Sequence, residues 1–286
     1  MTALGLHRVA TVARRSTVAT AVWIGGAMVV IAVGAAALSL AWMPYPPDQI
    51  DVLTRLESPS AAHWLGTDAF GRDVASRILA GARSALWVGF ASVFLGLGLG
   101  TALGLAASTL SAWSEEVLSR AADFLFAFPA VLSAILLAGI FGAGTTSAIL
   151  AIALFNIPVF ARVTRSAAAV LWRREFVHAA QAMGKSRLRI TLDHVLPNLA
   201  GLLVVQASAS FAVAILAEAA LSYLGLGVQP PEASWGRMLY EARTYLGPAP
   251  HLAVFPGLAL GMVVLGVNLL GDGLRDRLDP RLRPLH

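Results

Sequence analysis

The sequence predicts an all-α membrane protein with six transmembrane helices. Of its 286 residues, 57% are hydrophobic and only 13% are charged, and the mean hydropathy is +0.73. Because globular domains carry about 25% charged residues, this composition indicates a chain that lies largely in a bilayer. Uncharged runs of spanning length recur along the chain, and basic residues gather in alternate loops. The absence of cysteine excludes disulfides, thiolate metal sites and cysteine nucleophiles.

The first expected span covers residues 18–42 and contains no charge. Residues 1–17 precede it and carry Arg8, Arg14 and Arg15 without an acid. A cleaved signal peptide would have an apolar core of roughly 7–15 residues, so the longer run favours an uncleaved span. Residues 35–37 could imitate a cleavage site, but they lie inside this long run.

The remaining uncharged runs provide five further spans. They cover residues 84–110, 124–161, 199–217 and 252–271. The run 124–161 is nearly twice as long as one crossing of about 20 residues requires. Gly142, Gly144, Thr145 and Thr146 mark a turn near its middle, so we expect two spans there. Residues 84–271 thus form a five-helix core.

The distribution of basic residues predicts the orientation. With the N-terminus in the cytoplasm, 15 of the 21 Lys and Arg residues lie in the inside segments. The positive-inside rule therefore places both termini, including the tail 272–286, and the loop 162–198 in the cytoplasm. The loops 43–83 and 218–251 face the opposite compartment. This asymmetry explains the net charge of +5 better than nucleic-acid binding does.

The outside loop 43–83 is expected to contain an interfacial helix over residues 63–83. Asp73 and Arg77 are spaced for an i,i+4 ion pair. Phe70, Val74 and Ile78 form an apolar stripe at helical spacing. A direct role in receiving a donor protein is the alternative to a merely interfacial helix.

Small and polar residues inside the spans indicate how the helices pack. Gly96, Gly100 and Gly104 form a ladder of small residues that permits close helix contact. Three prolines are expected to kink their spans: Pro129, Pro158 and Pro256. The polar residues at membrane depth could line a pathway, although interhelical hydrogen bonding is favoured: Asn156, Gln206, Ser208, Ser210 and Asn268. Because no ionisable residue lies deep in an expected span, ion-coupled transport is disfavoured.

The polar stretch 173–198 organises the chain. It predicts a short amphipathic helix, a turn and a second helix that project from the bundle. The apolar face consists of Phe176, Val177, Ala180 and Met183, while Arg173, Arg174, Gln181 and Lys185 point elsewhere. Gly184 is expected to stop the first helix, and Ser186 to cap the second. Pro197 is expected where the chain re-enters the membrane.

Part of this stretch imitates a nucleotide-binding loop. Residues 179–186 read AAQAMGKS, which differs from GxxxxGK[ST] by alanine at the first position. A phosphate cradle needs a preceding strand and a glycine-rich turn, whereas these residues follow a helical pattern. We therefore expect no bound ATP, cofactor or metal. The six histidines also lack metal-ligand spacing, and no catalytic triad can be assembled.

Four segments resemble the inner-membrane permease subunits of ABC importers for dipeptides, oligopeptides and nickel, of the DppC/OppC type. They are LGTDAFGRDVASRILAGARSAL (65–86), EFVHAAQAMGKSRLRITLDHVLPN (175–198), AEAALSYLGLGVQPPEASWGRML (217–239) and LLGDGLRDRLDPRLRP (269–284). The resemblance covers residues 63–283. It implies a type I ABC importer permease fold with a cytoplasmic coupling helix.

The resemblance implies that 175–198 is the EAA motif, the loop that couples the permease to its ATPase. The implied coupling residues are Glu175, Phe176, His178, Ala179, Ala180, Met183, Gly184, Leu196 and Pro197. His178 departs from the motif, where glutamate is usual, which leaves the polar contact with the ATPase open. Phe176 and Met183 supply the apolar plug.

The resemblance also implies partners: a second permease, two ATPase subunits that hold ATP and Mg, and an extracytoplasmic solute-binding protein, besides membrane lipid. Gln229 and Trp235 would lie where substrate is handed over, although Trp235 is equally well explained as an interfacial aromatic anchor. The pathway candidates are Asn156, Gln206, Ser210 and Asn268.

The resulting hypothesis is a non-enzymatic permease subunit in the bacterial inner membrane, forming half of an ATP-driven pathway for dipeptides or oligopeptides. Nickel, heme, opines or glutathione remain alternative substrates. A passive channel, a membrane scaffold and a membrane-embedded enzyme remain alternative classes.

Overall fold

The computed structural model describes residues 3–110, 112–127 and 129–278, and its regular structure is helical. The described residues contain no strand, only an isolated bridge between Thr67 and Asp73. The α-helices are α1 (Ala3–Ala41), α2 (Val74–Thr109), α3 (Ala112–Ala127), α4 (Ala130–Phe141), α5 (Thr145–Leu171), α6 (Glu175–Ala182), α7 (Arg187–Ile190), α8 (Leu196–Tyr223), α9 (Trp235–Ala242) and α10 (His251–Leu278). The short turns are η1 (Val52–Thr54), the π-helical η2 (Thr191–Val195) and η3 (Arg243–Tyr245).

Five helical segments are long and apolar enough to cross a membrane. They are Thr20–Ala41, Val74–Thr109, Thr145–Leu171, Arg187–Tyr223 and His251–Asp276. A sixth crossing results if α3 and α4 together form one span, and their axes meet at 88°. Pro129 stands immediately before α4, where it cannot donate a helical hydrogen bond. The expected turn between the third and fourth spans is confirmed at Gly142 and Gly144, between α4 and α5.

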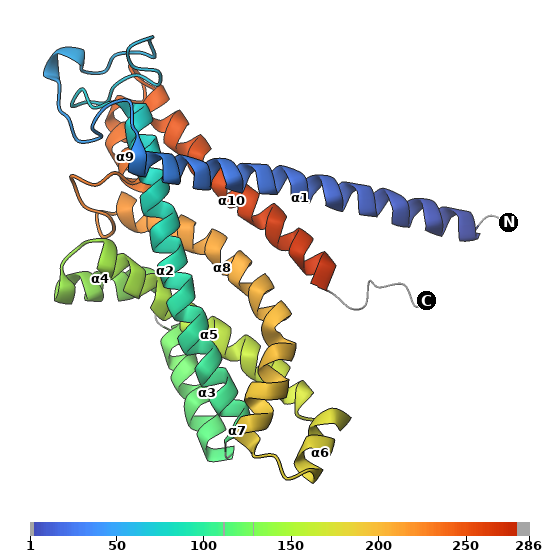
Figure 1. The fold of residues 1–286 in the computed structure, drawn as a ribbon. Coiled ribbons are helices and arrows are strands. Elements are labelled where there is room, and N and C mark those ends of the chain that lie inside the picture. Colours follow the sequence, from blue (N-terminus) through green and yellow to red (C-terminus); the bar gives the residue numbers. More distant parts are fainter. Residues whose placement is uncertain (1–2, 111, 128, 279–286) are drawn as a thin grey trace.

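The bundle has two distinct ends. The loop 43–73 and α9 gather at one of them, which we call the α9 end, whereas α6 and α7 lie at the opposite α6 end (Figure 1). Helix α1 packs against α10, where a Cβ on Gly25 would come within 2.7 Å of the Leu269 Cβ. Both helices are longer than the expected spans, since α1 begins at Ala3 and α10 ends at Leu278. The rest of the expected tail, residues 279–286, lies outside the described residues.

The packing of α2 on α5 is the closest helix contact along the expected glycine ladder. A Cβ on Gly96 would lie 2.4 Å from the Asn156 Cβ, one on Gly100 would lie 2.5 Å from the Ile157 carbonyl oxygen, and one on Gly104 would lie 2.5 Å from the Ala161 carbonyl oxygen. The ladder of small residues is thus confirmed. The two backbones approach so closely that no side chain fits between them.

The interfacial helix expected over residues 63–83 is not a separate element. Residues 63–73 form an irregular loop, in which Gly66 and Gly71 have φ of 78° and 75°. Residues 74–83 are the first turns of α2, which continues without a break to Thr109. The apolar stripe is therefore divided, because Phe70 lies exposed in the loop while Val74 is fully buried in the helix.

The expected ion pair between Asp73 and Arg77 does not form either, because Asp73 is the N-cap of α2. Its Oδ2 accepts hydrogen bonds from the backbone N–H and the hydroxyl of Ser76, at 2.8 and 2.9 Å. Its Oδ1 lies 3.0 Å from Nδ1 of His63. Capping occupies the carboxylate, and Arg77 instead faces Glu241 of α9.

We expect Gly100→Ala to destabilise the protein and Gly98→Ala to leave it unharmed. Both are on α2, but a Cβ at Gly98 meets nothing within 4 Å, whereas one at Gly100 meets the α5 backbone. Overpacking of this kind costs about 1–3 kcal/mol. Alanine in open space instead favours a helix by about 0.5–1 kcal/mol. Thermal unfolding of both variants in detergent measures the difference, and equal midpoints would contradict the ladder's role.

Candidate functional site

The segment from Trp172 to Asn198 contains the predicted coupling residues and caps the α6 end of the bundle (Figure 1). Helix α6 has two apolar faces rather than one. Val177 and Ala180 are 0% and 2% exposed and join the main core, whereas Phe176 and Met183 are 42% and 73% exposed. The expectation that all four share one face is therefore wrong. Val177 and Ala180 fasten the helix to the bundle, whereas Phe176, whose ring contacts His194, and Met183 keep much of their side chains exposed.

The remaining predicted residues of α6 lie on its exposed side. Glu175, His178 and Ala179 are all exposed. Glu175 occupies the first turn, where a negative charge is favoured by the helix dipole. Nδ1 of His178 lies 3.4 Å from the side-chain oxygen of Gln181, one turn later on the same helix.

Gly184 ends α6 as the sequence predicts. Its φ is +76°, a left-handed conformation that glycine adopts without steric penalty. Its N–H donates to the carbonyl of Gln181, and the N–H of Lys185 donates to the carbonyl of Ala180, which is a Schellman ending. The predicted cap is confirmed as well, because Ser186 precedes α7 and accepts a hydrogen bond from the N–H of Arg189.

The second helix of the segment does not stop before the membrane span. Residues 187–223 are helical throughout, passing from α7 through the π-helical η2 into α8. Leu196 and Pro197 are the first residues of α8, so Pro197 lies within this continuous rod. Since proline cannot donate to the carbonyl four residues earlier, the wider π turn just before it accommodates the change in hydrogen bonding.

The α7 to η2 region repeats the division seen in α6. Ile190 and Val195 are fully buried, whereas Leu188 and Leu192 are 66% and 52% exposed. Leu188 and Leu192 line the apolar groove between α2 and α8, whereas Phe176 and Met183 do not. We call Phe176 and Met183 the apolar row. Sequence analysis missed Leu188 and Leu192, although their i,i+4 spacing beside the buried Ile190 was an available signal.

The predicted pathway residues bond to their own helices. The Asn156 side chain donates to the carbonyl of Ile152, and that of Asn268 donates to the carbonyl of Val264. Gln206 donates to Ser210 within α8, and Ser208 donates to the carbonyl of Val205. The expectation that these polar side chains form hydrogen bonds between helices is therefore wrong, because in the described residues their hydrogen bonds stay within one helix. Asn156 is buried in the contact of α2 with α5, whereas Asn268 is exposed on α10.

Trp235 is neither a surface contact nor an interfacial anchor. It is 2% exposed, it donates from Nε1 to the Ile78 carbonyl at 3.1 Å, and its ring fills the space over Gly81. It therefore fixes the start of α9 against α2. Gln229 folds back on its own loop, donating to the carbonyls of Gly225 and Gly227.

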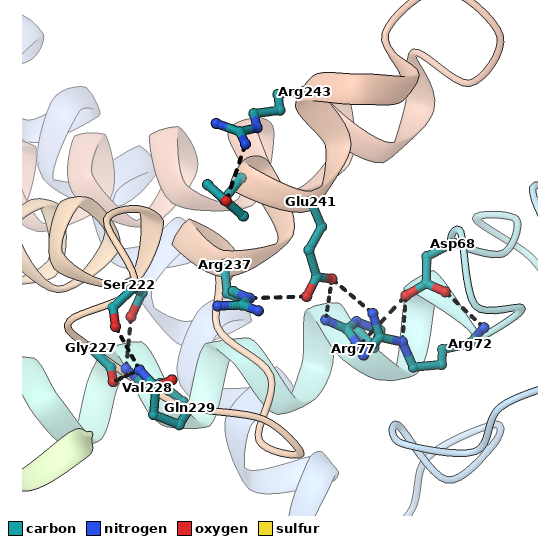
Figure 2. Close-up of polar contacts among 12 residues, drawn as sticks. Asp68, Arg72, Arg77, Ser222, Gly227, Val228, Gln229, Arg237, Glu241 and Arg243 are labelled. Carbon is teal, nitrogen blue, oxygen red and sulfur yellow. Dashed lines mark hydrogen bonds and ion pairs between the residues drawn. The ribbon is translucent and has the colours of Figure 1, made fainter. Parts of the chain in front are cut away.

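A cluster of charged residues joins three parts of the α9 end. Glu241 of α9 accepts hydrogen bonds from Arg72, Arg77 and Arg237, at 2.8, 3.1 and 3.1 Å. Asp68 lies 2.6 Å from Nε of Arg72 and 3.6 Å from Arg77. Figure 2 shows Glu241 between Arg237 and Arg77, with Asp68 on the far side of Arg77. Arg77 is 2% exposed, so these two carboxylates balance a charge that has lost its water.

Glu218 lies near the end of α8, just beyond the expected span 199–217. The uncharged run ends at residue 217, but α8 continues to Tyr223 and Glu218 is fully buried. Its Oε1 accepts hydrogen bonds from Ser222 and Ser234, both at 2.8 Å. Ser222 in turn accepts from the N–H of Val228, as Figure 2 shows. Glu218 thus ties α8 to the loop that leads into α9.

Comparisons with known proteins agree on one family. Residues 95–284 match the family model described as "Binding-protein-dependent transport system inner membrane component". The chain is 46% identical over 242 residues to the glutathione transport system permease protein GsiD of Pectobacterium atrosepticum, covering 84% of this chain and 80% of that protein. It is also 46% identical over 229 residues to the dipeptide transport system permease protein DppC of Alkalihalophilus pseudofirmus, covering 80% and 75%.

A solved structure has the same fold. A chain of the MetNI methionine ABC transporter in an inward-facing conformation aligns with a TM-score of 0.60 at 19% identity, covering 71% of this chain and 96% of that chain. At this identity the likeness concerns the fold alone. The expected type I importer permease fold and the resemblance drawn from the four motifs are confirmed.

We expect Glu241→Ala to destabilise the α9 end strongly. The substitution leaves the buried Arg77 with only Asp68, at 3.6 Å, and breaking a buried ion pair costs about 3 kcal/mol or more. Glu232→Ala is the matched control, because Glu232 is exposed and its side chain accepts a 3.3 Å hydrogen bond from the hydroxyl of Thr145. Unfolding midpoints in detergent compare the two, and a Glu241→Ala protein as stable as the control would contradict the cluster's role.

Proposed function

The chain belongs to the family of binding-protein-dependent transport system inner membrane components, and we propose that it forms half of an ATP-driven import pathway for dipeptides or oligopeptides. The peptide assignment is supported by two relatives at 46% identity, which are named for glutathione, a tripeptide, and for dipeptides. Glutathione itself is the second candidate substrate. Nickel, heme and other small solutes remain less supported alternatives.

The observation that carries the coupling role is the apolar row. Phe176 of α6 and Met183, which directly follows α6, are exposed, while the same segment is fastened to the core by fully buried neighbours. Exposed apolar surface on a rigidly held element is characteristic of an interaction site. A segment that served only as a solvated loop would gain nothing from such a row.

The partner of the apolar row is inferred to be an ATPase subunit. Phe176 and Met183 would enter an apolar groove of the ATPase, while Glu175, His178 and Ala179 contact its rim. Ala180, Gly184, Leu196 and Pro197 would act by shaping the segment, since Ala180 is buried and Gly184 forms the turn. An ATPase that moves such a helix moves α8 as well, because α7 and α8 are one continuous rod.

The complete importer would contain a second permease, two ATPase subunits and an extracytoplasmic solute-binding protein. We infer that the ATPases hold ATP and Mg, and that this chain binds no cofactor and hydrolyses nothing itself. With the α6 end and both termini in the cytoplasm, the positive-inside rule is satisfied. The α9 end then faces the binding protein. Because Trp235 is buried and Gln229 is bonded to its own loop, the exposed residues that directly follow α9, Arg243 and Thr244, would make that contact.

We expect Phe176→Asp to lower peptide import at least about tenfold, because a carboxylate would have to enter the ATPase groove without water. Gln181→Asp places the same group on the opposite side of α6 and should leave import intact. Import of a radiolabelled dipeptide and co-purification of the ATPase measure both variants.

Gly184→Pro should abolish import without preventing membrane insertion, because proline cannot adopt the φ of +76° at this turn. Normal import by Phe176→Asp and Gly184→Pro would remove the coupling assignment.

We expect the purified chain to give no peptide flux in liposomes on its own. The complete importer with ATP should accumulate the labelled dipeptide, and excess unlabelled dipeptide should suppress this uptake while Ni²⁺ does not. The physical reason is that the pathway needs a second permease and an external energy source. Flux from the isolated chain would instead support a passive channel, and suppression by Ni²⁺ alone would support a metal substrate.

A further inference from the structure

The cytoplasmic end of α2 is capped by a side chain from residues 172–198, which we call the coupling segment. Nη1 of Arg187, the first residue of α7, donates to the carbonyl oxygens of Thr109 and Leu110, at 3.0 and 3.4 Å. These are carbonyls at the C-terminus of α2, which have no helical partner and carry the negative end of its dipole. The guanidinium therefore satisfies both the hydrogen bonding and the charge of this helix end.

A buried hydroxyl pair joins the same two elements. Oγ1 of Thr109 lies 3.0 Å from Oγ1 of Thr191, and these residues are 7% and 3% exposed. The Thr191 hydroxyl donates to the carbonyl of Arg187 at 2.9 Å, which leaves the Thr109 hydroxyl to donate across the pair. We call Arg187, Thr191 and Thr109 the α2 junction.

Arg187 also contacts the end of α5. Its guanidinium carbon lies 5.8 Å from the centre of the Trp172 ring, and Trp172 directly follows the last residue of α5. A single side chain of the coupling segment thus touches the ends of α2 and α5, the two helices that pack most closely through the glycine ladder.

The junction matters because α2 and α8 have little direct contact near it. In their other halves they pack tightly, with a Cβ on Gly89 only 3.0 Å from the Phe211 ring. Toward the α6 end they diverge around an apolar groove of about 1180 Å³, lined from Leu97 to Leu110 on one side and from Arg187 to Ala207 on the other. At the base of this groove, the α2 junction closes the gap again with hydrogen bonds.

We propose that Arg187 and Thr191 are positioning residues that transmit movement of the coupling segment to α2 as well as to α8. The inference rests on the proposed coupling function of this segment. Because only three residues separate the end of α5 from α6, a pull on α6 and α7 reaches both α5 and α8 directly through the chain. Without the junction, α2 would follow only through its packing on α5, and the groove between α2 and α8 would open. With the junction, the adjoining ends of α2 and α8 move together.

The first test removes the junction in the complete importer. The double variant Arg187→Ala, Thr191→Val should lower dipeptide import per ATP hydrolysed about fivefold or more, while ATPase co-purification and basal ATP hydrolysis stay unchanged. Arg189→Ala is the matched control, since this exposed arginine lies two residues further on and, among the described residues, bonds only through its backbone N–H. Arg187→Lys keeps a cation at the helix end and should retain most of the import. Wild-type import by the double variant would overturn the proposal, as would an Arg187→Lys protein as defective as Arg187→Ala.

The second test uses the absence of cysteine from this chain. In a Thr109→Cys, Thr191→Cys importer, oxidation should form a disulfide within the chain and leave import at the unoxidised rate, because the two positions move together. Loss of import that a reductant restores would overturn the proposal. Failure of the disulfide to form would also overturn it, since the junction would then be open in the working importer. Each single cysteine variant controls for oxidation elsewhere.

The two proposals fail in different ways. If the coupling function is wrong, Gly184→Pro imports normally. If only the junction is wrong, Gly184→Pro abolishes import while the double variant retains it.

Discussion

The closeness of α2 and α5 is the constraint on which the other contacts depend. Three glycines of α2 bring its backbone against that of α5, and this pair carries attachments at both ends. At the α9 end, α2 receives Trp235 and Glu241 from α9. At the α6 end, its last carbonyls receive Arg187. Packing in a bilayer gains little from apolar burial, because lipid tails are as apolar as leucine. Close backbone contact and satisfied polar groups at the helix ends therefore hold the bundle.

The polar contacts are distributed according to the cost of placing charge in hydrocarbon. Arg77, Glu241 and their partners lie at one end, and Arg187 lies at the other. The polar side chains between them, such as Asn156 and Asn268, bond to their own helices. The described middle of the bundle therefore consists of helices without an ionisable group that could itself drive transport. Such a design suits a transport subunit that is moved from its ends.

The segment proposed to couple this chain to an ATPase, residues 172–198, combines two properties that movement by a partner requires. Val177, Ile190 and Val195 are fully buried, so the segment is fixed to the bundle. The apolar row on its outer side is exposed and free to be covered. The continuous helix from α7 to α8 carries displacement inward, and Glu218 anchors the far end of that helix to the loop before α9. A partner at the α6 end can thus influence the α9 end through one rod.

Sequence alone determined the properties that depend on local pattern. Composition and run length specify a multi-span helical protein, Gly184 and Ser186 specify a helix stop and a cap, and spaced glycines specify close packing, because each is encoded within a few neighbouring residues.

Tertiary structure decided which partner each side chain meets. The charge at Glu218 suggested the end of a span, yet α8 continues past it, and serines of two elements donate hydrogen bonds to one oxygen of the buried carboxylate. Asp73 was spaced to pair with Arg77, but Glu241, 164 residues away in sequence, takes that place. Phe176 and Val177 are adjacent and similarly apolar, and only the position of the bundle beneath α6 buries one and exposes the other. Contacts between distant segments depend on how the rods are assembled, and no local pattern records that.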